Sequence, residues 1–259
     1  MKNIIITLIA SVLTISALNA QVTGPPNAGN CDKVAPDSSR MLDEYSLYRE
    51  FANQKNYQDA LAHWKYIFNN APGFRKTPYF DGIKIYKHFA DNAADEETKQ
   101  LYVDTLMMVY YKRIECFGER GYVIGRMAYD ILKYRKSAED LIRSLIAESI
   151  ELRGDTTDYF LLYPYFMYNK KAWAEKKIDD DALLEIYDQL IAIAENNANN
   201  EKSADKYEAS KAKIDKAFPT DLLQCDRLIP RINKHFADKK NDTLQLKKWF
   251  NLLRKGACL

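Results

Sequence analysis

The stretch NYQDALAHWKYIFNNAP, residues 56–72, decides how the rest of the chain is interpreted. Its apolar residues recur at the spacing of a helix that buries one face, and Pro72 follows where such a helix would end. The small Ala60 allows a second helix to approach closely, and Trp64 is large enough to fill the space between the two. We therefore expect a helical hairpin at this point.

The same helical spacing continues from Met41 towards the end of the chain. No segment has the alternating pattern of a strand, and the segments between the apolar runs are short. The sequence therefore predicts an all-α fold built from helix hairpins. After the first hairpin, helices are expected at residues 78–92, 96–116, 121–134, 138–153, 158–175, 180–198, 202–217, 221–236 and 243–255, with the helix at 202–217 partly solitary.

Two of these expected helices share the pattern Y-x-x-G-x-x-x-Y, as YFDGIKIY at 79–86 and YVIGRMAY at 122–129. A glycine inside a helix costs about 1 kcal/mol relative to alanine. A close contact with a neighbouring helix is the expected compensation at Gly82 and Gly125. The shared pattern favours repeated hairpins, and an ordinary helical bundle with chance glycines is the alternative.

Residues 41–74 resemble the tetratricopeptide repeat (TPR), a helix–turn–helix unit of about 34 residues. Glu44 and Tyr48 depart from the family's usual tryptophan and glycine, and the resemblance weakens beyond residue 153. It implies a right-handed α-solenoid of TPR-like helix hairpins over 41–198, followed by a C-terminal helical hairpin region over 199–259. The apolar and closing positions of the family, aligned on Ala60, fall on Leu47, Phe51, Tyr57, Trp64 and Pro72.

The same resemblance implies a function. In this family the first helices of the hairpins line a concave groove that binds extended peptides or partner segments. Tyrosine and arginine are enriched at such interfaces because they combine apolar area with a polar end. Packing between repeats is the alternative role for each tyrosine. The candidate partner-binding residues, at groove positions of the first helices, are Tyr45, Arg49, Tyr79, Tyr86, Tyr122, Arg126 and Tyr129.

The beginning of the chain predicts export. Residues 1–20 contain one lysine followed by an uncharged apolar run that ends in a small residue, which is the pattern of a secretory signal peptide. Residues 21–40 contain three prolines and are expected to be an irregular lead-in. No later stretch is long and apolar enough for a transmembrane segment. We therefore expect a periplasmic or envelope-associated protein, with the bacterial setting implied by the TPR resemblance.

Four cysteines in an exported chain favour disulfides. Cys225 and Cys258 fall at the adjacent ends of two antiparallel helices, so we expect them to pair and to stabilise the hairpin by about 3 kcal/mol. For Cys31 and Cys116 two alternatives remain. They either pair with each other or leave Cys116 as a buried thiol between Ile114 and Phe117.

Residues that could carry catalysis are scarce. No nucleophile elbow, phosphate-binding loop or zinc-protease motif occurs, and His63, His88 and His235 lie far apart in the sequence. The acidic clusters at 94–98 and 179–182 open helices, where carboxylates cap backbone N–H groups, and they lack the spacing of a calcium loop. We therefore expect no catalytic residue, no metal and no cofactor. A helical envelope hydrolase and a structural spacer are the alternatives.

Charge distinguishes the end of the chain from the rest. The formal net charge is +2, which together with export argues against nucleic acid, yet residues 226–259 carry nine Lys or Arg against three Asp. Leu246, Trp249, Phe250 and Leu253 form an apolar stripe on the last helix. The first interpretation of this stripe is core packing against the preceding hairpin, with the lysines on a solvated face. Because repeat stacks need a polar capping helix, a homo-oligomer contact or further repeats at this end are the alternatives. The expected partner is a protein or peptide of the cell envelope.

Overall fold

The computed structural model describes residues 31–32 and 37–259. In this part of the chain the elements are helices joined by short loops, without a strand, so the all-α prediction is confirmed. The predicted signal peptide and most of the lead-in lie outside the described residues. The helices are α1 Ser38–Asn53, α2 Tyr57–Asn70, α3 Thr77–Asp91, α4 Glu96–Phe117, α5 Arg120–Tyr134, α6 Glu139–Arg153, η1 Gly154–Thr156, α7 Tyr159–Ala174, α8 Asp180–Asn196, α9 Ala204–Ala217, η2 Thr220–Leu223, α10 Cys225–Lys239 and α11 Thr243–Lys255.

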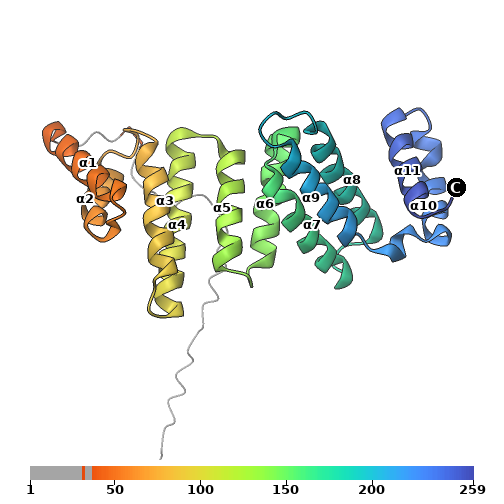
Figure 1. Ribbon diagram of the computed structural model, residues 1–259, viewed down its shortest axis with the longest axis horizontal. Helices are drawn as coiled ribbons and strands as arrows, with labels where there is room; N and C mark the ends of the chain where they lie inside the picture. The colour runs from red at the N-terminus through yellow and green to blue at the C-terminus, as the bar shows by residue number, and fades with distance from the viewer. Residues whose placement is uncertain (1–30, 33–36) are drawn as a thin grey trace, which may run out of the picture.

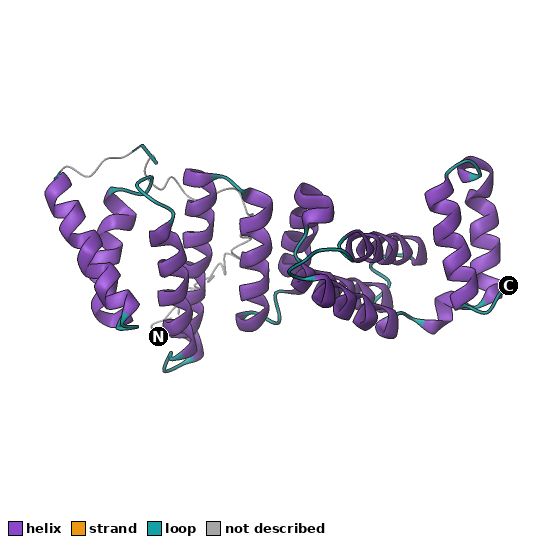
Figure 2. Ribbon diagram, turned by 45° about the horizontal axis from the view of Figure 1, so that its top comes forward, coloured by secondary structure: helices purple, strands orange, loops and turns teal. Residues whose placement is uncertain are grey.

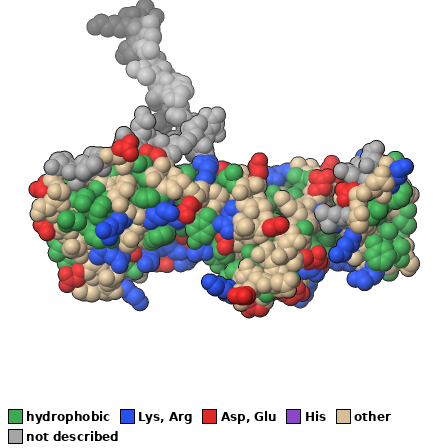
Figure 3. All heavy atoms as spheres, turned by 90° about the horizontal axis from the view of Figure 1, so that it is seen from above, with side chains coloured by type: hydrophobic (Ala, Val, Ile, Leu, Met, Phe, Trp, Pro, Cys, Tyr) green, Lys and Arg blue, Asp and Glu red, His purple; other side chains and the backbone are tan. Residues whose placement is uncertain are grey.

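The helices follow one another along an elongated body, which is clear in the ribbon views (Figure 1 and Figure 2). α1 packs against α2, α3 against α4, and α5 against α6, and each of these antiparallel hairpins contacts the next one along the chain. Seen from above, the body is long and narrow (Figure 3). The order of hairpins in the sequence is therefore also their order in space, and each predicted helix lies close to its predicted boundaries.

Acidic side chains fix the start of several helices. Asp37, Asp95 and Asp179 precede α1, α4 and α8, and each accepts a hydrogen bond from the backbone N–H three residues further on. These bonds satisfy N–H groups that have no partner within the helix. The capping role predicted for the clusters at 94–98 and 179–182 is thus confirmed. At the other end, Gly118 and Gly154 follow α4 and α6 with φ of 68° and 50°, a backbone region that favours glycine.

Trp64 connects two hairpins. Its ring lies against Gly82 of α3, where a Cβ atom would come within 2.4 Å of the ring, and its Nε1 donates a hydrogen bond to the carbonyl oxygen of Pro78 at 2.6 Å. The Trp64 ring therefore reaches across to the next hairpin, a contact that the sequence analysis did not predict. The predicted close contact at Gly82 is confirmed.

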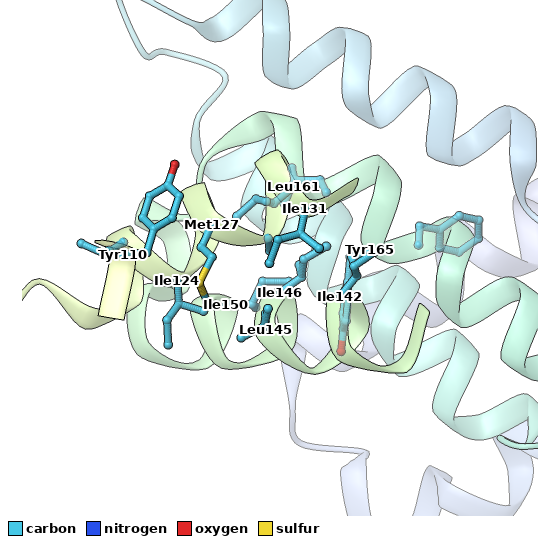
Figure 4. Packing of buried hydrophobic residues seen from close by; sticks show 14 of the residues in the cluster. Tyr110, Ile124, Met127, Ile131, Ile142, Leu145, Ile146, Ile150, Leu161 and Tyr165 are labelled. Carbon is cyan, nitrogen blue, oxygen red and sulfur yellow. The ribbon is translucent and has the colours of Figure 1, made fainter. Parts of the chain in front are cut away.

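The second predicted glycine contact is also present. A Cβ on Gly125 would lie 2.6 Å from Ser149 Oγ on α6 and 2.8 Å from Leu161 Cδ1 on α7. Around it, buried side chains of α4, α5, α6 and α7 interdigitate (Figure 4). This region of the core contains Tyr110, Ile124, Met127, Ile131, Ile142, Leu145, Ile146, Ile150, Leu161 and Tyr165.

The helix α9 packs against both α7 and α8. Tyr207 Oη donates a hydrogen bond to the carbonyl oxygen of Thr157 at 2.7 Å, and Ser210 Oγ donates one to that of Tyr159 at 3.0 Å. The prediction that the helix at 202–217 is partly solitary is therefore wrong. After the first three hairpins the chain forms a three-helix unit, α7–α8–α9, and then the separate hairpin α10–α11.

Two disulfides tie the chain to itself. Cys225 Sγ and Cys258 Sγ are 2.12 Å apart and join the start of α10 to the segment after α11, at the place expected from the sequence. Cys31 Sγ and Cys116 Sγ are 2.04 Å apart and join the lead-in to the end of α4. Of the two alternatives for Cys31 and Cys116, the structure therefore has the pair rather than the free thiol.

Candidate partner-binding surface

Tyr79 and Tyr86 are core residues. Their exposed fractions are 1% and 5%, and burial raises the pKa of Tyr86 to about 12. Tyr79 Oη donates a hydrogen bond to the carbonyl oxygen of Pro72 at 2.8 Å, and the Tyr86 ring meets Trp64 edge-on at 5.5 Å between centroids. A partner could not reach either ring without unpacking α3 from α2. Their prediction as partner-binding residues is wrong, and the alternative role, packing between hairpins, applies.

Tyr45 and Arg49 on α1 are half-buried and engaged within the molecule. The Tyr45 ring makes an edge contact with Phe74 at 5.4 Å between centroids, and Arg75 lies over it at 5.6 Å. Arg49 pairs with the buried carboxylate of Asp81. Both side chains therefore first stabilise the contact between the first two hairpins, and only their outer edges are available to a partner.

The three predicted residues of α5 lie at the surface. Tyr122 is half-buried between the guanidinium groups of Arg113 and Arg153, which lie 5.5 and 5.2 Å from its ring centroid. Arg126 and Tyr129 are exposed and both contact the ring of Phe160 on α7, at 5.0 and 4.7 Å. Because positions four and seven residues apart share one face of a helix, these side chains form a continuous strip along α5.

This strip extends to α3 through a residue that the sequence analysis missed. Phe80 is 43% exposed, and the guanidinium of Arg113 lies 4.7 Å from its ring centroid. Tyr129, at the opposite end, is 48% exposed. Each such cation–π contact contributes about 0.5–1 kcal/mol at an exposed site. We call this surface the arginine–aromatic row. It consists of Phe80, Arg113, Tyr122, Arg126, Tyr129, Arg153 and Phe160.

Carboxylates beneath and beside the row are already paired. Asp130 is buried and accepts hydrogen bonds from Lys87 Nζ at 2.5 Å and from Tyr110 Oη at 2.6 Å. Glu119 pairs with both Lys76 and Arg113 at 3.0 Å, and these partners hold the pKa of its carboxyl below the usual range. No acidic side chain in the described part of the chain pairs with Arg126. The row therefore presents this guanidinium group beside exposed aromatic rings. This combination would bind a partner's carboxylate that lies next to an apolar side chain.

Sequence reasoning could have found part of the missing set. Phe80 lies next to Tyr79, so a shift of the assumed groove positions in α3 by one residue would have selected it. Arg113, Arg153 and Phe160 come from a second helix or from outside the clear repeats, and they reach the row only through packing. For these three residues the sequence held no usable signal.

A separate cleft lies between α8 and the α10–α11 hairpin. Its volume is about 510 Å³, and one wall carries the carboxylates of Asp181, Glu185 and Asp188, while Arg231 and Lys248 line the hairpin side. Burial raises the pKa of Asp188 to about 6, although the charges of Lys248 and Arg231 act in the opposite direction. A raised carboxyl pKa in a cleft is one of the features that enzymes show.

The histidines give no sign of a shared site. His63 Nδ1 lies 2.6 Å from Glu44 Oε2, and the ring of His88 contacts Tyr57 at 4.9 Å between centroids. The side chain of His235 lies outside what the structure describes. Within the described residues no cluster of three or more His, Cys, Asp or Glu could hold a metal ion. Nor does any helix there combine the length and apolar character needed to cross a membrane.

Comparison with known proteins gives no family for the chain: no family model, no curated protein and no solved structure matches it.

Proposed function

We propose that this chain is an exported, TPR-like α-solenoid that serves as a binding scaffold and captures a protein or peptide segment of the cell envelope. The observation that carries the proposal is the arginine–aromatic row, which crosses α3, α5 and α7 and keeps Phe80, Arg126 and Tyr129 accessible. No cofactor takes part. Affinity would come from these few anchors rather than from the total contact area.

The proposed solenoid is supported by the sequential contacts of the hairpins. α2 contacts α3, α4 contacts α5, and α6 contacts α7, so that each hairpin meets its neighbours in the chain. Contacts limited to neighbouring units are what repeat proteins have in common. α5 also contacts α7, which brings first helices of neighbouring units together along one side. The right-handed superhelix and the concave groove are part of the proposal.

The proposed export is supported by two independent features. The apolar run at residues 1–20 has the form of a signal peptide, and two cysteine pairs lie at disulfide distance. Disulfides persist in oxidising compartments such as the periplasm. A periplasmic or envelope location is therefore the setting in which we expect the partner.

The chemistry of the row indicates which segment it would take. Arg126 has no carboxylate partner of its own among the described residues, and the rings of Tyr129 and Phe160 lie beside it. A segment with an acidic side chain next to an aromatic or aliphatic one would satisfy both features. We therefore expect the partner to be recognised through an acidic, partly apolar stretch.

Affinity capture from an envelope fraction tests the proposal. The mature chain serves as bait beside a variant with Phe80→Ala, Arg126→Ala and Tyr129→Ala. A second variant with Arg40→Ala and Tyr66→Ala is the matched control, because it removes an arginine–tyrosine contact of 4.6 Å outside the row. We expect a partner whose capture falls at least about tenfold with the first variant and is unchanged with the second. Equal capture by all three would contradict the assignment of the row.

A hydrolase is the second candidate, favoured by the raised pKa of Asp188 in the α8 cleft. It requires at least two carboxylates that cooperate on one substrate, and Asp181, Glu185 and Asp188 line the same wall. If the folded chain turned over an envelope polymer and Asp188→Asn abolished this turnover, hydrolase activity would replace the scaffold as the proposed function. A structural spacer, the third candidate, would tolerate changes in both surfaces.

A further inference from the structure

The α10–α11 hairpin has two faces of different character. Towards α8 it presents Leu228, Ile232 and Leu252, which are buried. Its exposed large apolar side chains are Ile229, Phe236 and Phe250, with exposed fractions of 40%, 47% and 53%. Ile229 and Phe236 are seven residues apart and therefore share one side of α10. Phe236 also contacts Trp249, the neighbour of Phe250 in α11, at 6.3 Å between ring centroids.

We call the surface formed by Ile229, Phe236 and Phe250 the outer face. It lies at the end of the elongated body, where Figure 3 shows hydrophobic side chains gathered with Lys and Arg at their border. Exposed aromatic side chains on neighbouring helices form a larger apolar patch than scattered surface residues would, and such a patch marks an interaction site.

The α10–α11 hairpin as a whole is strongly positive. Of the 38 Lys and Arg and 36 Asp and Glu in the chain, nine and three lie within 226–259, which leaves 29 and 33 for the rest. Arg227, Arg231 and Lys255 pair with acidic residues of α8 and α9 and are thereby neutralised. The exposed Lys and Arg of this hairpin that have no ion pair within the described residues are Lys234, Lys240, Lys247 and Arg254. Of these, Lys234, Lys247 and Arg254 also line the clefts between the hairpin and α8.

These features define the chemistry of the occupant. Exposed Phe side chains on a hairpin rich in Lys and Arg complement the boundary of an anionic lipid bilayer, where rings enter the headgroup region and cations contact lipid phosphates. A second copy in symmetric contact would bring two positively charged hairpins together, which like-charge repulsion opposes. The rest of the chain carries a net negative charge, so the hairpin is the part that an anionic surface would attract.

We propose that the outer face of the α10–α11 hairpin binds reversibly to an anionic lipid surface, with Phe236 and Phe250 inserted and the flanking cations on the headgroups. The body of the chain would then extend away from the membrane. This site is independent of the arginine–aromatic row, so either proposal can fail while the other holds.

Vesicle co-sedimentation tests the proposal with the oxidised mature chain. Vesicles of phosphatidylcholine alone are compared with vesicles that also contain phosphatidylglycerol. We expect binding to the anionic vesicles, and a variant with Phe236→Ser and Phe250→Ser to bind at least about tenfold more weakly. A variant with Leu101→Ser and Leu152→Ser is the matched control, since it removes two exposed apolar side chains from α4 and α6. It should bind like the unmodified chain.

A charge-reversed variant, Lys247→Glu with Arg254→Glu, keeps the aromatic residues and guards against a folding defect in the first variant. It should also lose most of its binding to anionic vesicles. The proposal is overturned if the unmodified chain binds neither vesicle, if it binds both equally, or if Phe236→Ser with Phe250→Ser binds unchanged. It is also overturned if light scattering shows a dimer without lipid that this variant converts to a monomer, because the outer face would then be an interface between copies.

Discussion

The helices α3 and α5 carry the same eight-residue pattern and place it in opposite surroundings. In α3, Gly82 lies against Trp64 of the preceding hairpin, and Tyr79 and Tyr86 are buried with it. In α5, Gly125 lies against Ser149 and Leu161 of the helices that follow. Tyr122 and Tyr129 of α5 are left at the surface. The pattern thus occurs in helices that pack closely against a neighbour at the glycine. Which neighbouring helix packs there determines whether the tyrosines of the pattern are buried.

The position after the pattern joins the two helices. It is Lys87 in α3 and Asp130 in α5, and these two residues form an ion pair with 2.5 Å between Nζ and Oδ1. One turn further on, Lys133 of α5 pairs with Asp91 of α3 at 2.5 Å. Equivalent positions in the two copies of the pattern are therefore in direct contact. Substitutions in α3 and α5 can test which contacts keep the tyrosines of α3 buried and those of the pattern in α5 at the surface.

The largest effect is expected for Gly82→Ala. The new Cβ would lie 2.4 Å from the Trp64 ring, which is held by its hydrogen bond to Pro78 and by stacking on Phe68 at 4.7 Å. We expect the free energy of unfolding to fall by about 3 kcal/mol, measured by urea denaturation. A loss below about 1 kcal/mol would mean that Trp64 can move, and that the α2–α3 contact does not depend on glycine.

Gly125→Ala should cost less, about 1–2 kcal/mol, because the nearest atoms are the ends of the Ser149 and Leu161 side chains. The same substitution made together with Ser149→Ala provides the control. Removal of the hydroxyl takes away the closest atom, so the additional cost of Gly125→Ala should shrink in that background. An unchanged cost would place the strain at Leu161 instead.

A buried tyrosine of the pattern in α3 and an exposed one in α5 should differ in their response to loss of the hydroxyl. Tyr79→Phe leaves the Pro72 carbonyl oxygen without its buried donor and should lower the free energy of unfolding by about 1 kcal/mol. Tyr129→Phe removes an exposed hydroxyl and should change it by less than about 0.5 kcal/mol. Thermal unfolding followed by circular dichroism would measure both. Equal losses would show that the different burial of the two rings has no energetic consequence.

The smallest effect concerns pH. Burial alone would raise the pKa of Asp91, but hydrogen bonds from Lys133 and Tyr134 outweigh it and hold the pKa below the usual value. A lowered pKa in the folded state adds stability above the unfolded pKa of about 4, and this stability is lost as the pH falls through the folded pKa. Asp91→Asn should therefore cost a few tenths of a kcal/mol at neutral pH and nothing in strong acid. An equal cost at both pH values would assign the effect to packing.

Much of the fold could be predicted because it depends on local signals. The spacing of apolar residues, the acidic caps at Asp95 and Asp179, and the glycines at 82 and 125 each act within a few residues or within one helix contact. The position of α9 could not be predicted, because its contacts with α7 span about fifty residues and leave no periodic trace.

The candidate surface was predictable only where one helix supplies it. Tyr122, Arg126 and Tyr129 all come from α5 and lie on its exposed side. Tyr79 and Tyr86 occupy matching positions but are buried against Phe68 and Trp64 of α2, and nothing within α3 itself indicates this. Whether these tyrosines are buried depends on the size of the side chains in the preceding helix. An alignment of the repeats treats that helix as equivalent in every unit.

The bond between Cys31 and Cys116 determines how the molecule would carry a mechanical load. It spans 85 positions and encloses the first two hairpins in a covalent loop. A pulling force applied at the two ends of the chain would pass from one sulfur to the other and leave α1 to α4 unloaded. About 300 Å of extended chain would be withheld from stretching, at about 3.5 Å per residue. The bond between Cys225 and Cys258 bypasses α10 and α11 in the same way. Under oxidising conditions the force would therefore act on the helices from α5 to α9, whereas under reducing conditions the first two hairpins and α10–α11 would also bear it.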